Sequence, residues 1–479
     1  MITTAGITTL CFIILVAIPM FFAATAPYSD FTLASITVGM IVVYSSARLA
    51  QIAGSSKQQV LRTTFWLFVY VFFGLTAFVQ VTINTFPWAG RYQIDELVEA
   101  SAIIIVGLVS FDLGQRLAGH QKDFGVPTIL KRNITKFGVG LVGISALVSA
   151  PYLIQRLGGI YVFFLPRVAK FEAVSAEVES SVEMMLVSRL LSTPMFVSLV
   201  AAIAIWIASR QKRSVVGIRW KFLIFFLLIA TMLLNNPIST PRFQVGTVLL
   251  SLFFVLPWRR WSNLIAIGGL VLGLVIVFPL TDLFRSRLDA SLSQRIAETD
   301  LTAELVQGDF DAFQVTTNTI SVVQRNGHQL GSQISGALLF WIPRNWWAGK
   351  PISTGQWIAE RKGYHFTNLS APLWAEFYVD GGWILILLGF IAYGYLIKTI
   401  DDWYARSVQH GRVQIITALA PIFAGYQFFF LRGALISAVA SLAPIILFLF
   451  ICSLSVSLNL FTGHRHRPKN LPKHNLIVD

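Results

Sequence analysis

The strongest constraint on this chain is a series of apolar stretches, each long enough to cross a lipid bilayer as a helix. A spanning helix needs about 20 mostly apolar residues. We predict twelve such helices, at residues 7–25, 32–52, 63–84, 97–118, 135–154, 186–208, 219–235, 243–258, 262–281, 383–400, 412–430 and 434–457. Only 13% of the residues are charged, against about 25% in an ordinary soluble domain. We therefore expect an all-α, polytopic membrane protein.

The loops between these stretches differ sharply in charge. The segments after the even-numbered predicted helices carry 22 basic and 4 acidic residues, a net charge of +18. The rest of the chain carries 15 basic and 19 acidic residues, a net charge of −4. Loops rich in Lys and Arg stay in the cytoplasm, so both termini are expected inside. The overall charge of +14 is then a topology signal, and no nucleic-acid partner is expected.

One outer loop is much longer than the others. It covers residues 282–382, between the ninth and tenth predicted helices, and a loop of this length without repeats is usually functional. A smaller outer loop lies at 151–187. We expect three parts: residues 1–281 with nine helices, the large loop at 282–382, and residues 383–479 with the last three helices and a basic tail.

Six cations lie on the outer side, against the general charge bias. They are Arg242, Arg285, Arg287, Arg344, Lys350 and Arg432. Cations beside spanning helices are costly without a partner, and a guanidinium matches phosphate oxygens in bidentate geometry. We therefore expect these side chains to bind the diphosphate of a membrane-bound substrate. The alternative is solvent exposure, or pairing with the ten acids of the large loop. Arg242 and Arg432 have few acids nearby in sequence, which makes them the strongest candidates.

Asp311, His365 and Glu376 are the candidate acid–base groups, because a general base must reach the hydroxyl that it activates. A lone His is more often structural, and Glu376 could equally pair with Arg or Lys. Asp309 and Asp311 form an Asp-x-Asp pattern, which is used to hold a metal ion and a sugar diphosphate. An Asp at a helix start is more often a cap or a dipole partner. Positions i and i+2 of a helix point apart, so no metal site is expected.

Two further patterns concern structure. Phe310, Phe313, Ile320 and Val323 share one stripe, which predicts a helix over Asp309–Arg325. The segment Gly138-Val139-Gly140-Leu141-Val142-Gly143 matches Gly-x-Gly-x-x-Gly, but it lies inside a predicted spanning helix with no preceding strand. It therefore predicts close helix packing rather than a nucleotide cofactor. We expect the same of Gly269 and Gly273.

The block Phe340–Pro351, the connector at Arg242 and the turn at Arg432 together resemble the Wzy-type polymerases of O-antigen and related repeat-unit polysaccharides. The most specific part is Ile342-Pro343-Arg344 followed by Trp347-Ala348-Gly349-Lys350-Pro351. Ala348 departs from the family, in which proline is more usual before the glycine. The many helices and the late, large outer loop are also similar to that family.

The resemblance implies a GT-C-type glycosyltransferase in the bacterial inner membrane. The growing glycan would leave a polyprenyl diphosphate and join the non-reducing end of a new lipid-linked unit, without a nucleotide sugar, ATP or another cofactor. The partners implied are the lipid-linked oligosaccharide, membrane lipid, a chain-length regulator and a flippase.

Two alternatives remain open at this point. An O-antigen ligase, which moves glycan onto a lipid core, uses the same donor and differs only in its acceptor. A flippase for lipid-linked glycans would also have about twelve helices and internal cations. Such transporters tend to have internal repeats and short loops, and this chain has no repeat and one very long loop.

Overall fold

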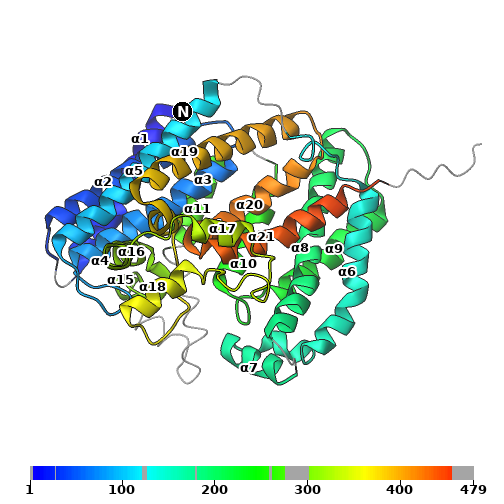
Figure 1. Ribbon diagram of the computed structural model, residues 1–479. Helices are drawn as coiled ribbons and strands as arrows, with labels where there is room; N and C mark the ends of the chain where they lie inside the picture. Colours follow the sequence, from blue (N-terminus) through cyan, green and yellow to red (C-terminus); the bar gives the residue numbers. More distant parts are fainter. Residues whose placement is uncertain are drawn as a thin grey trace, which may run out of the picture.

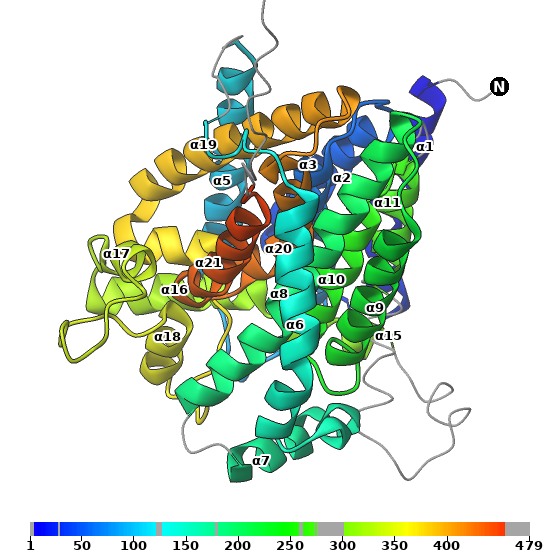
Figure 2. The same cartoon turned by 90° about the vertical axis from the view of Figure 1, so that its right-hand side faces the viewer.

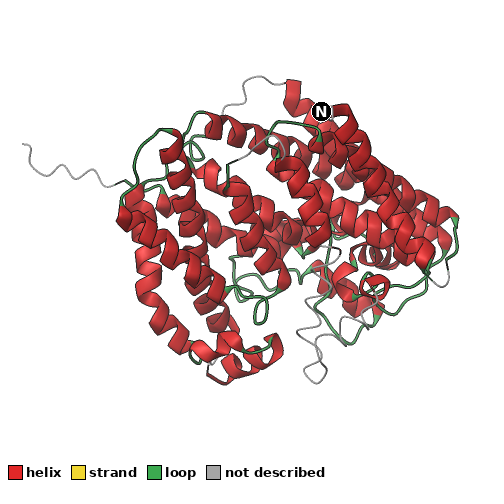
Figure 3. Ribbon diagram, turned by 180° about the vertical axis from the view of Figure 1, so that it is seen from behind, coloured by secondary structure: helices red, strands yellow, loops and turns green. Residues whose placement is uncertain are grey.

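The computed structural model describes residues 4–26, 29–120, 127–177, 181–257, 262–273, 275 and 301–455, and this part of the chain is all-helical, without a β-strand (Figures 1 and 3). Nine helices in it are long and apolar enough to cross a membrane, which confirms the prediction of an all-α, polytopic membrane protein. They are α1 (Thr4–Thr25), α2 (Leu33–Ala53), the continuous run of α3 (Val60–Phe68), η1 (Val69–Leu75) and α4 (Thr76–Thr82), α5 (Ile94–His120), α6 (Lys136–Arg156), α8 (Ser181–Gln211), α19 (Leu373–Gln409), α20 (Ile415–Arg432) and α21 (Leu435–Cys452).

Two of the other three predicted spans are shorter helices. α9 (Ile218–Leu234) and α10 (Arg242–Val255) have 17 and 14 residues, fewer than the roughly 20 that a straight crossing needs. α10 ends early because Leu256 precedes a proline and is extended, with ψ at 157°. α11 is described over Ser262–Leu272, and the end of its predicted span lies outside the described residues.

The run α3–η1–α4 forms the centre of the molecule. Every residue in its apolar window is buried, and it packs against α2, α19 and α20. A helix surrounded by others can be apolar on every side, and residues 65–79 of the run are apolar or aromatic apart from Thr76. Figure 2 shows α3 enclosed between the α2 and α19 sides of the bundle.

Glycines allow the closest helix contacts. A Cβ placed at Gly114 of α5 would lie 2.0 Å from the carbonyl oxygen of Ile391, and one at Gly394 of α19 would lie 2.0 Å from that of Phe111. The backbones of α5 and α19 therefore touch, as small residues permit in membrane helices. This contact sets the direction of α19. The helix extends from one end of the molecule to the other, so it contributes residues to both.

The predicted packing role of the Gly-x-Gly-x-x-Gly segment is confirmed at two of its glycines. A Cβ at Gly138 would lie 2.4 Å from the carbonyl oxygen of Cys452, and one at Gly143 would lie 3.2 Å from Leu227. The same expectation for Gly269 and Gly273 is not met among the described residues, since no atom lies within 4 Å of a Cβ built there.

The connecting elements gather at one end of the molecule, which we call the loop end (Figures 1 and 2). This end carries η2 (Ile160–Phe164), α7 (Arg167–Glu177), α15 (Leu301–Glu304), η4 (Gly308–Phe310), α16 (Ala312–Asn326), α17 (Ser332–Leu338) and α18 (Thr354–Lys362). We call the opposite end, where α1 begins, the basic end. The loop elements are not a separate lobe, because α16 packs against α5, α19 and η1.

Two element boundaries differ from the prediction. The helix expected over Asp309–Arg325 begins at Ala312, and a short 3₁₀ turn precedes it, although all four apolar residues of the predicted stripe are buried. α19 begins at Leu373, ten residues before the predicted 383. It breaks at Gly381 and Gly382, where Gly382 has φ of +59°, a value that favours glycine.

Candidate functional site

Arg242 is the first residue of α10 and lies against the large loop. Its Nη1 donates to Asp309 Oδ2 at 2.7 Å. The arginine side chain is 9% exposed and that of Asp309 is 43% exposed. The connector before α10 is held by Asn236, whose amide donates to the carbonyl oxygens of Phe163 and Leu233 at 2.8 Å. These bonds explain why a short connector can place a cation at a defined position.

Arg432 is the last residue of α20 and reaches the same segment of the loop. Its Nη2 donates to the carbonyl oxygen of Gly308 at 2.8 Å and to Asp311 Oδ1 at 3.0 Å. Its own carbonyl oxygen accepts a hydrogen bond from the Ala371 N–H at 3.0 Å. The Nε–H of Arg432 is buried and finds no acceptor among the described residues, so the guanidinium retains donor capacity.

Asp311 is a buried acceptor that several groups of this network contact. Its side chain is 2% exposed, and besides Arg432 it accepts hydrogen bonds from Ser370 Oγ at 2.6 Å and from Trp88 Nε1 at 2.9 Å. Asp311 occupies the N-cap position of α16, but its side chain makes no capping bond. The capping alternative is thus wrong for Asp311, whose carboxylate instead ties three distant segments together.

The two arginines therefore converge on one short segment. Asp309 and Asp311 are two residues apart, and two residues of chain span at most about 7 Å. α10 and α20, which carry the arginines, also pack directly on each other. For both arginines, the structure agrees with the alternative prediction, in which outer cations pair with acids of the large loop. In these pairs, Asp309 and Asp311 turn to different arginines.

A cavity of about 220 Å³ adjoins the start of α10. It is lined by Thr240, Pro241 and Gln244 from that side and by Lys170 of α7. Lys170 Nζ donates to Ser239 Oγ at 3.3 Å and lies 4.4 Å from the centre of the Phe163 ring. Burial lowers the pKa of Lys170 to about 8, because an ammonium loses hydration in an apolar setting.

Lys170 is a candidate site residue that the sequence reasoning missed. It stands in a segment with several glutamates, and nothing in that pattern distinguishes it from a solvated lysine. A possible signal is the apolar run Ile160–Leu165 that precedes it, because such a run inside a polar loop indicates a surface against which a neighbour can be buried.

Glu376 is buried, and both of its oxygens are engaged. Thr354 Oγ1 donates to one at 2.6 Å, and the N–H of Leu435, the first residue of α21, donates to the other at 2.8 Å. Asp380 acts similarly and accepts from the N–H groups of Gln333 and Ile334 at the start of α17. Both carboxylates thus accept from N–H groups at helix starts, which have no partner within their own helix. These contacts indicate that Glu376 anchors the start of α21.

The other expected site residues that the structure describes do not join the two arginines. Arg344 donates to the carbonyl oxygens of Lys350 and Pro351 at 2.7 and 3.1 Å, and Lys350 donates to those of Phe340 and Ile342 at 2.6 and 2.9 Å. Both cations thus close the loop Phe340–Pro351 on itself. His365 is exposed and its ring lies edge-on to Phe366. Arg285 and Arg287 lie outside the described residues.

Within the part of the loop that the structure describes, the geometry provides cations and an accessible carboxylate. Arg242 and Arg432 are held at the ends of two packed helices, and Lys170 lies near the start of one of them. Asp309 is far more exposed than Asp311, so it is the carboxylate that a bound molecule can reach. Such an arrangement suits an anion that must be gripped while a nearby proton is moved.

Comparison of the chain with protein-family models, with curated proteins and with solved structures found no match.

Proposed function

We propose that this protein is a glycosyltransferase that polymerises lipid-linked oligosaccharide repeat units at the periplasmic face of the bacterial inner membrane. The growing glycan passes from polyprenyl diphosphate to the non-reducing end of a new lipid-linked unit. The observation that carries the proposal is the convergence of Arg242 and Arg432 on Asp309 and Asp311. The resemblance of the connector, the loop and the turn to Wzy-type polymerases adds to it.

The proposed reaction breaks the bond between the anomeric carbon and the diphosphate oxygen of the donor. Negative charge then develops on the leaving diphosphate, and donors that are already oriented stabilise it without reorganising. Arg242 and Arg432 are such donors, because the carboxylates and the Gly308 carbonyl hold their guanidinium groups in place. The Arg432 side chain is 27% exposed, so its guanidinium keeps donors that a phosphate oxygen can reach.

The acceptor hydroxyl forms the new bond to the anomeric carbon and loses its proton. Among the expected bases, Asp311 and Glu376 are buried and engaged by several donors. We assign the proton to Asp309, whose side chain is 43% exposed and lies beside Arg242. Asp309 thus replaces Asp311 as our candidate base, because a general base must be able to approach its substrate.

The proposal requires the loop end to face the periplasm and both termini to lie in the cytoplasm. The charge asymmetry of the loops supports this orientation. Reporter fusions at Gly327 and Gly158 are expected to report a periplasmic position, and a fusion at Gln211 a cytoplasmic one. A cytoplasmic position for Gly327 would overturn the proposal.

The function itself is tested with a deletion strain whose surface glycan is separated on a gel. A polymerase deletion leaves one repeat unit on each lipid core. A ligase or flippase deletion leaves none, because the glycan then never reaches the core. Restoration of long chains by the wild-type gene, but not by Arg242→Ala at equal abundance, connects the phenotype to the site.

A further inference from the structure

Two adjoining cavities lie at the basic end, away from the site described above. Their volumes are about 750 and 630 Å³. They share Ala208, Gly411, Arg412 and Val413, so they adjoin at these residues, and we call the two together the depression. The 20 residues of α19 between Gly382 and Asp402 correspond to about 30 Å of helix, which separates this depression from the loop end.

The lining of the two cavities is strongly cationic. Of the described residues that line them, Asp402 is the single acid, and it pairs with Lys398. Arg62 pairs with Asp401 behind the wall. The other cations have no ion-pair partner within the described ranges; they are Lys57, Lys131, Lys136, Lys212, Arg406 and Arg412.

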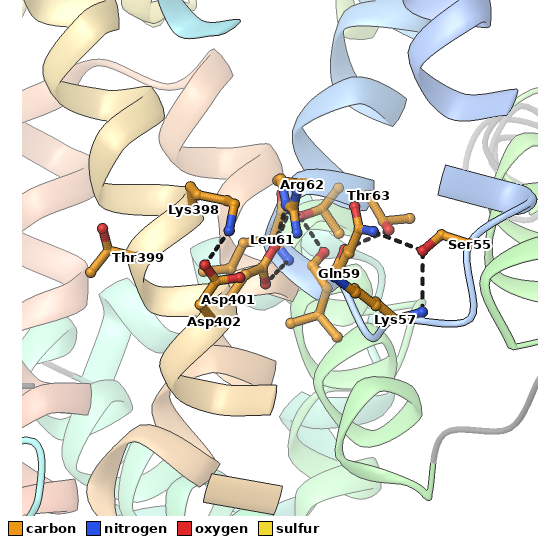
Figure 4. A network of polar contacts seen from close by, with 12 residues as sticks. Ser55, Lys57, Gln59, Leu61, Arg62, Thr63, Lys398, Thr399, Asp401 and Asp402 are labelled. Carbon is orange, nitrogen blue, oxygen red and sulfur yellow. Dashed lines mark hydrogen bonds and ion pairs between the residues drawn. The ribbon is translucent and has the colours of Figure 1, made fainter. Parts of the chain in front are cut away.

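The wall of the larger cavity is held by a buried network, drawn in Figure 4. Asp401 of α19 is fully buried and accepts from the N–H groups of Leu61 and Arg62 at 2.9 and 3.1 Å and from Arg62 Nε at 3.3 Å. Nearby, Tyr404 Oη accepts from Gln58 Nε2 at 3.2 Å and donates to the carbonyl oxygen of Phe254 at 3.0 Å. These bonds join α3, α10 and α19, so the cavity has a defined shape.

Arg412 lies at the junction of the two cavities. It follows Gly411, which adopts φ of +59° and turns the chain between α19 and α20. A Cβ at Gly411 would lie 3.2 Å from Cε of Lys212, so the Lys212 side chain crosses this turn. Lys212, just after α8, and Arg412, between α19 and α20, therefore both lie at this turn and line the smaller cavity. An anion bound between them would reduce the repulsion between their charges.

The rest of the lining indicates what kind of anion fits. Ala204, Ile207, Val255 and Leu256 give the larger cavity an apolar side, next to the cationic rim. A general excess of lysine and arginine at one membrane face explains charged loops. It does not explain why six unpaired cations surround one depression that has a single, already paired acid.

We propose that the two cavities form one binding site for a phosphate-bearing anion, gripped by Lys212 and Arg412 at the junction. Basic pockets between membrane helices bind phosphorylated lipid headgroups, and the apolar side suits an acyl chain. A soluble diphosphate carries the same recognised group. The site is independent of the proposed glycosyl transfer, since it lies at the other end of the molecule.

The test uses the purified full-length chain in detergent and a matched pair of double variants. Lys212→Gln with Arg412→Gln removes the two junction cations. Arg219→Gln with Lys221→Gln removes two exposed cations at the start of α9 that line neither cavity. Native mass spectrometry measures binding of cardiolipin against phosphatidylcholine, and calorimetry measures binding of inorganic pyrophosphate. Thermal unfolding without ligand verifies that both variants fold like the wild type.

We expect wild-type protein to prefer cardiolipin over phosphatidylcholine and the junction variant to bind it roughly twentyfold to thirtyfold more weakly, since each basic residue contributes about 1 kcal/mol. The α9 variant should bind like the wild type. Loss of pyrophosphate binding alone in the junction variant would identify a soluble source for the same phosphate group. Equal losses in both variants, or binding of neither ligand, would overturn the proposal.

Discussion

The cations at the two ends of the molecule differ in whether an acid pairs with them. At the loop end, Arg242 and Arg432 each contact a carboxylate of one short loop segment. At the basic end, six cations surround two cavities and have no acid partner within the described chain. Paired cations are fixed in direction before a ligand arrives, which is what transition-state stabilisation needs. Unpaired cations attract anions from a distance, which suits binding without chemistry.

Two arginine–aspartate pairs, one at each end, also differ in burial. Asp401, which pairs with Arg62, is fully buried, whereas Asp309, which pairs with Arg242, is 43% exposed. Removing one partner of a buried pair leaves an uncompensated charge in a poorly polarisable interior. Removing one partner of an exposed pair lets water take its place. Asp309 is therefore open to a ligand, whereas Asp401, like Asp311 at the loop end, is buried and serves the fold.

The largest expected effect tests this contrast in burial. Asp401→Ala removes the acceptor for two N–H groups at the start of α3 and the partner of Arg62. We expect it to lower the free energy of unfolding by about 3–5 kcal/mol. Asp309→Ala is the matched comparison and should lower it by less, because this carboxylate is 43% exposed, although Arg242 beside it is 9% exposed. Thermal unfolding of both variants in one detergent measures the difference, and equal losses would contradict the contrast.

The next prediction concerns catalysis at the loop end. Arg432→Ala should reduce the synthesis of long glycans roughly a hundredfold to a thousandfold, the effect of losing one oriented donor to a developing anion. Arg432→Lys should restore little, because an ammonium cannot reproduce the guanidinium fork. Turnover of purified lipid-linked repeat units measures both. Arg219→Ala, at the basic end and outside both cavities, is the control, and normal chain lengths from Arg432→Ala at wild-type abundance would show that this arginine is structural.

A smaller loss is expected at Arg242, because its partner Asp309 is exposed to solvent. Arg242→Ala removes a charged hydrogen bond of roughly 1.5–3 kcal/mol, which corresponds to about a tenfold to hundredfold loss of rate. The informative control exchanges the charges, with Arg242→Asp and Asp309→Arg combined. That variant rebuilds the ion pair but removes the cation from the start of α10. If it polymerises normally, the pair only supports the fold.

Lys170 gives a pH dependence that the paired arginines lack. Burial lowers its pKa to about 8, so the charge is present below pH 8 and is lost as the pH rises through that value. About nine-tenths of the side chains are charged at pH 7 and about one-tenth at pH 9. We expect the affinity for the lipid-linked diphosphate to fall by up to about tenfold over this range. Lys170→Arg should flatten the profile, and a profile that keeps its slope in this variant would assign it to another group.

The smallest effect is expected from metal removal. The arginines that we assign to the diphosphate offer positive charge at the point where a metal ion would act. We therefore expect turnover by the purified enzyme to be unchanged in excess EDTA. If EDTA abolishes turnover, and magnesium or manganese restores it in the wild type but not in Asp309→Asn or Asp311→Asn, the Asp-x-Asp segment is a metal site and the arginine mechanism is wrong.

The sequence predicted most of the fold because a spanning helix is a local feature. The nine long helices lie within the predicted apolar stretches or overlap them. The start of α19 was missed because the prediction rested on long apolar runs. Leu373–Asp380 contains two acids, which interrupt such a run, and it is buried by neighbouring parts of the protein instead. α10 was predicted too long because its apolar composition continues into Pro257, which the helix itself does not reach.

The sequence predicted which residues belong to the site better than it predicted the contacts between them. Arg242 and Arg432 were selected as cations in positions without nearby acids, yet each pairs with an acid far along the chain, 67 and 121 residues away. Pairs at such separations depend on how helices pack, and no local pattern encodes that. The burial of Lys170 and of Glu376 was hidden for the same reason, since both depend on neighbours supplied by other elements.

The bond between Asp401 and the start of α3 has a consequence for how the chain is made. Arg62 and Asp401 are 339 residues apart, so during synthesis the beginning of α3 emerges long before its acceptor. At about 5–20 residues per second the wait is roughly 20–70 s. For that time the central helix carries an arginine and open N–H groups without their final partner. Assembly of the core is therefore completed late, and until α19 arrives the protein covers α3 only with elements such as α2 that are made before α19.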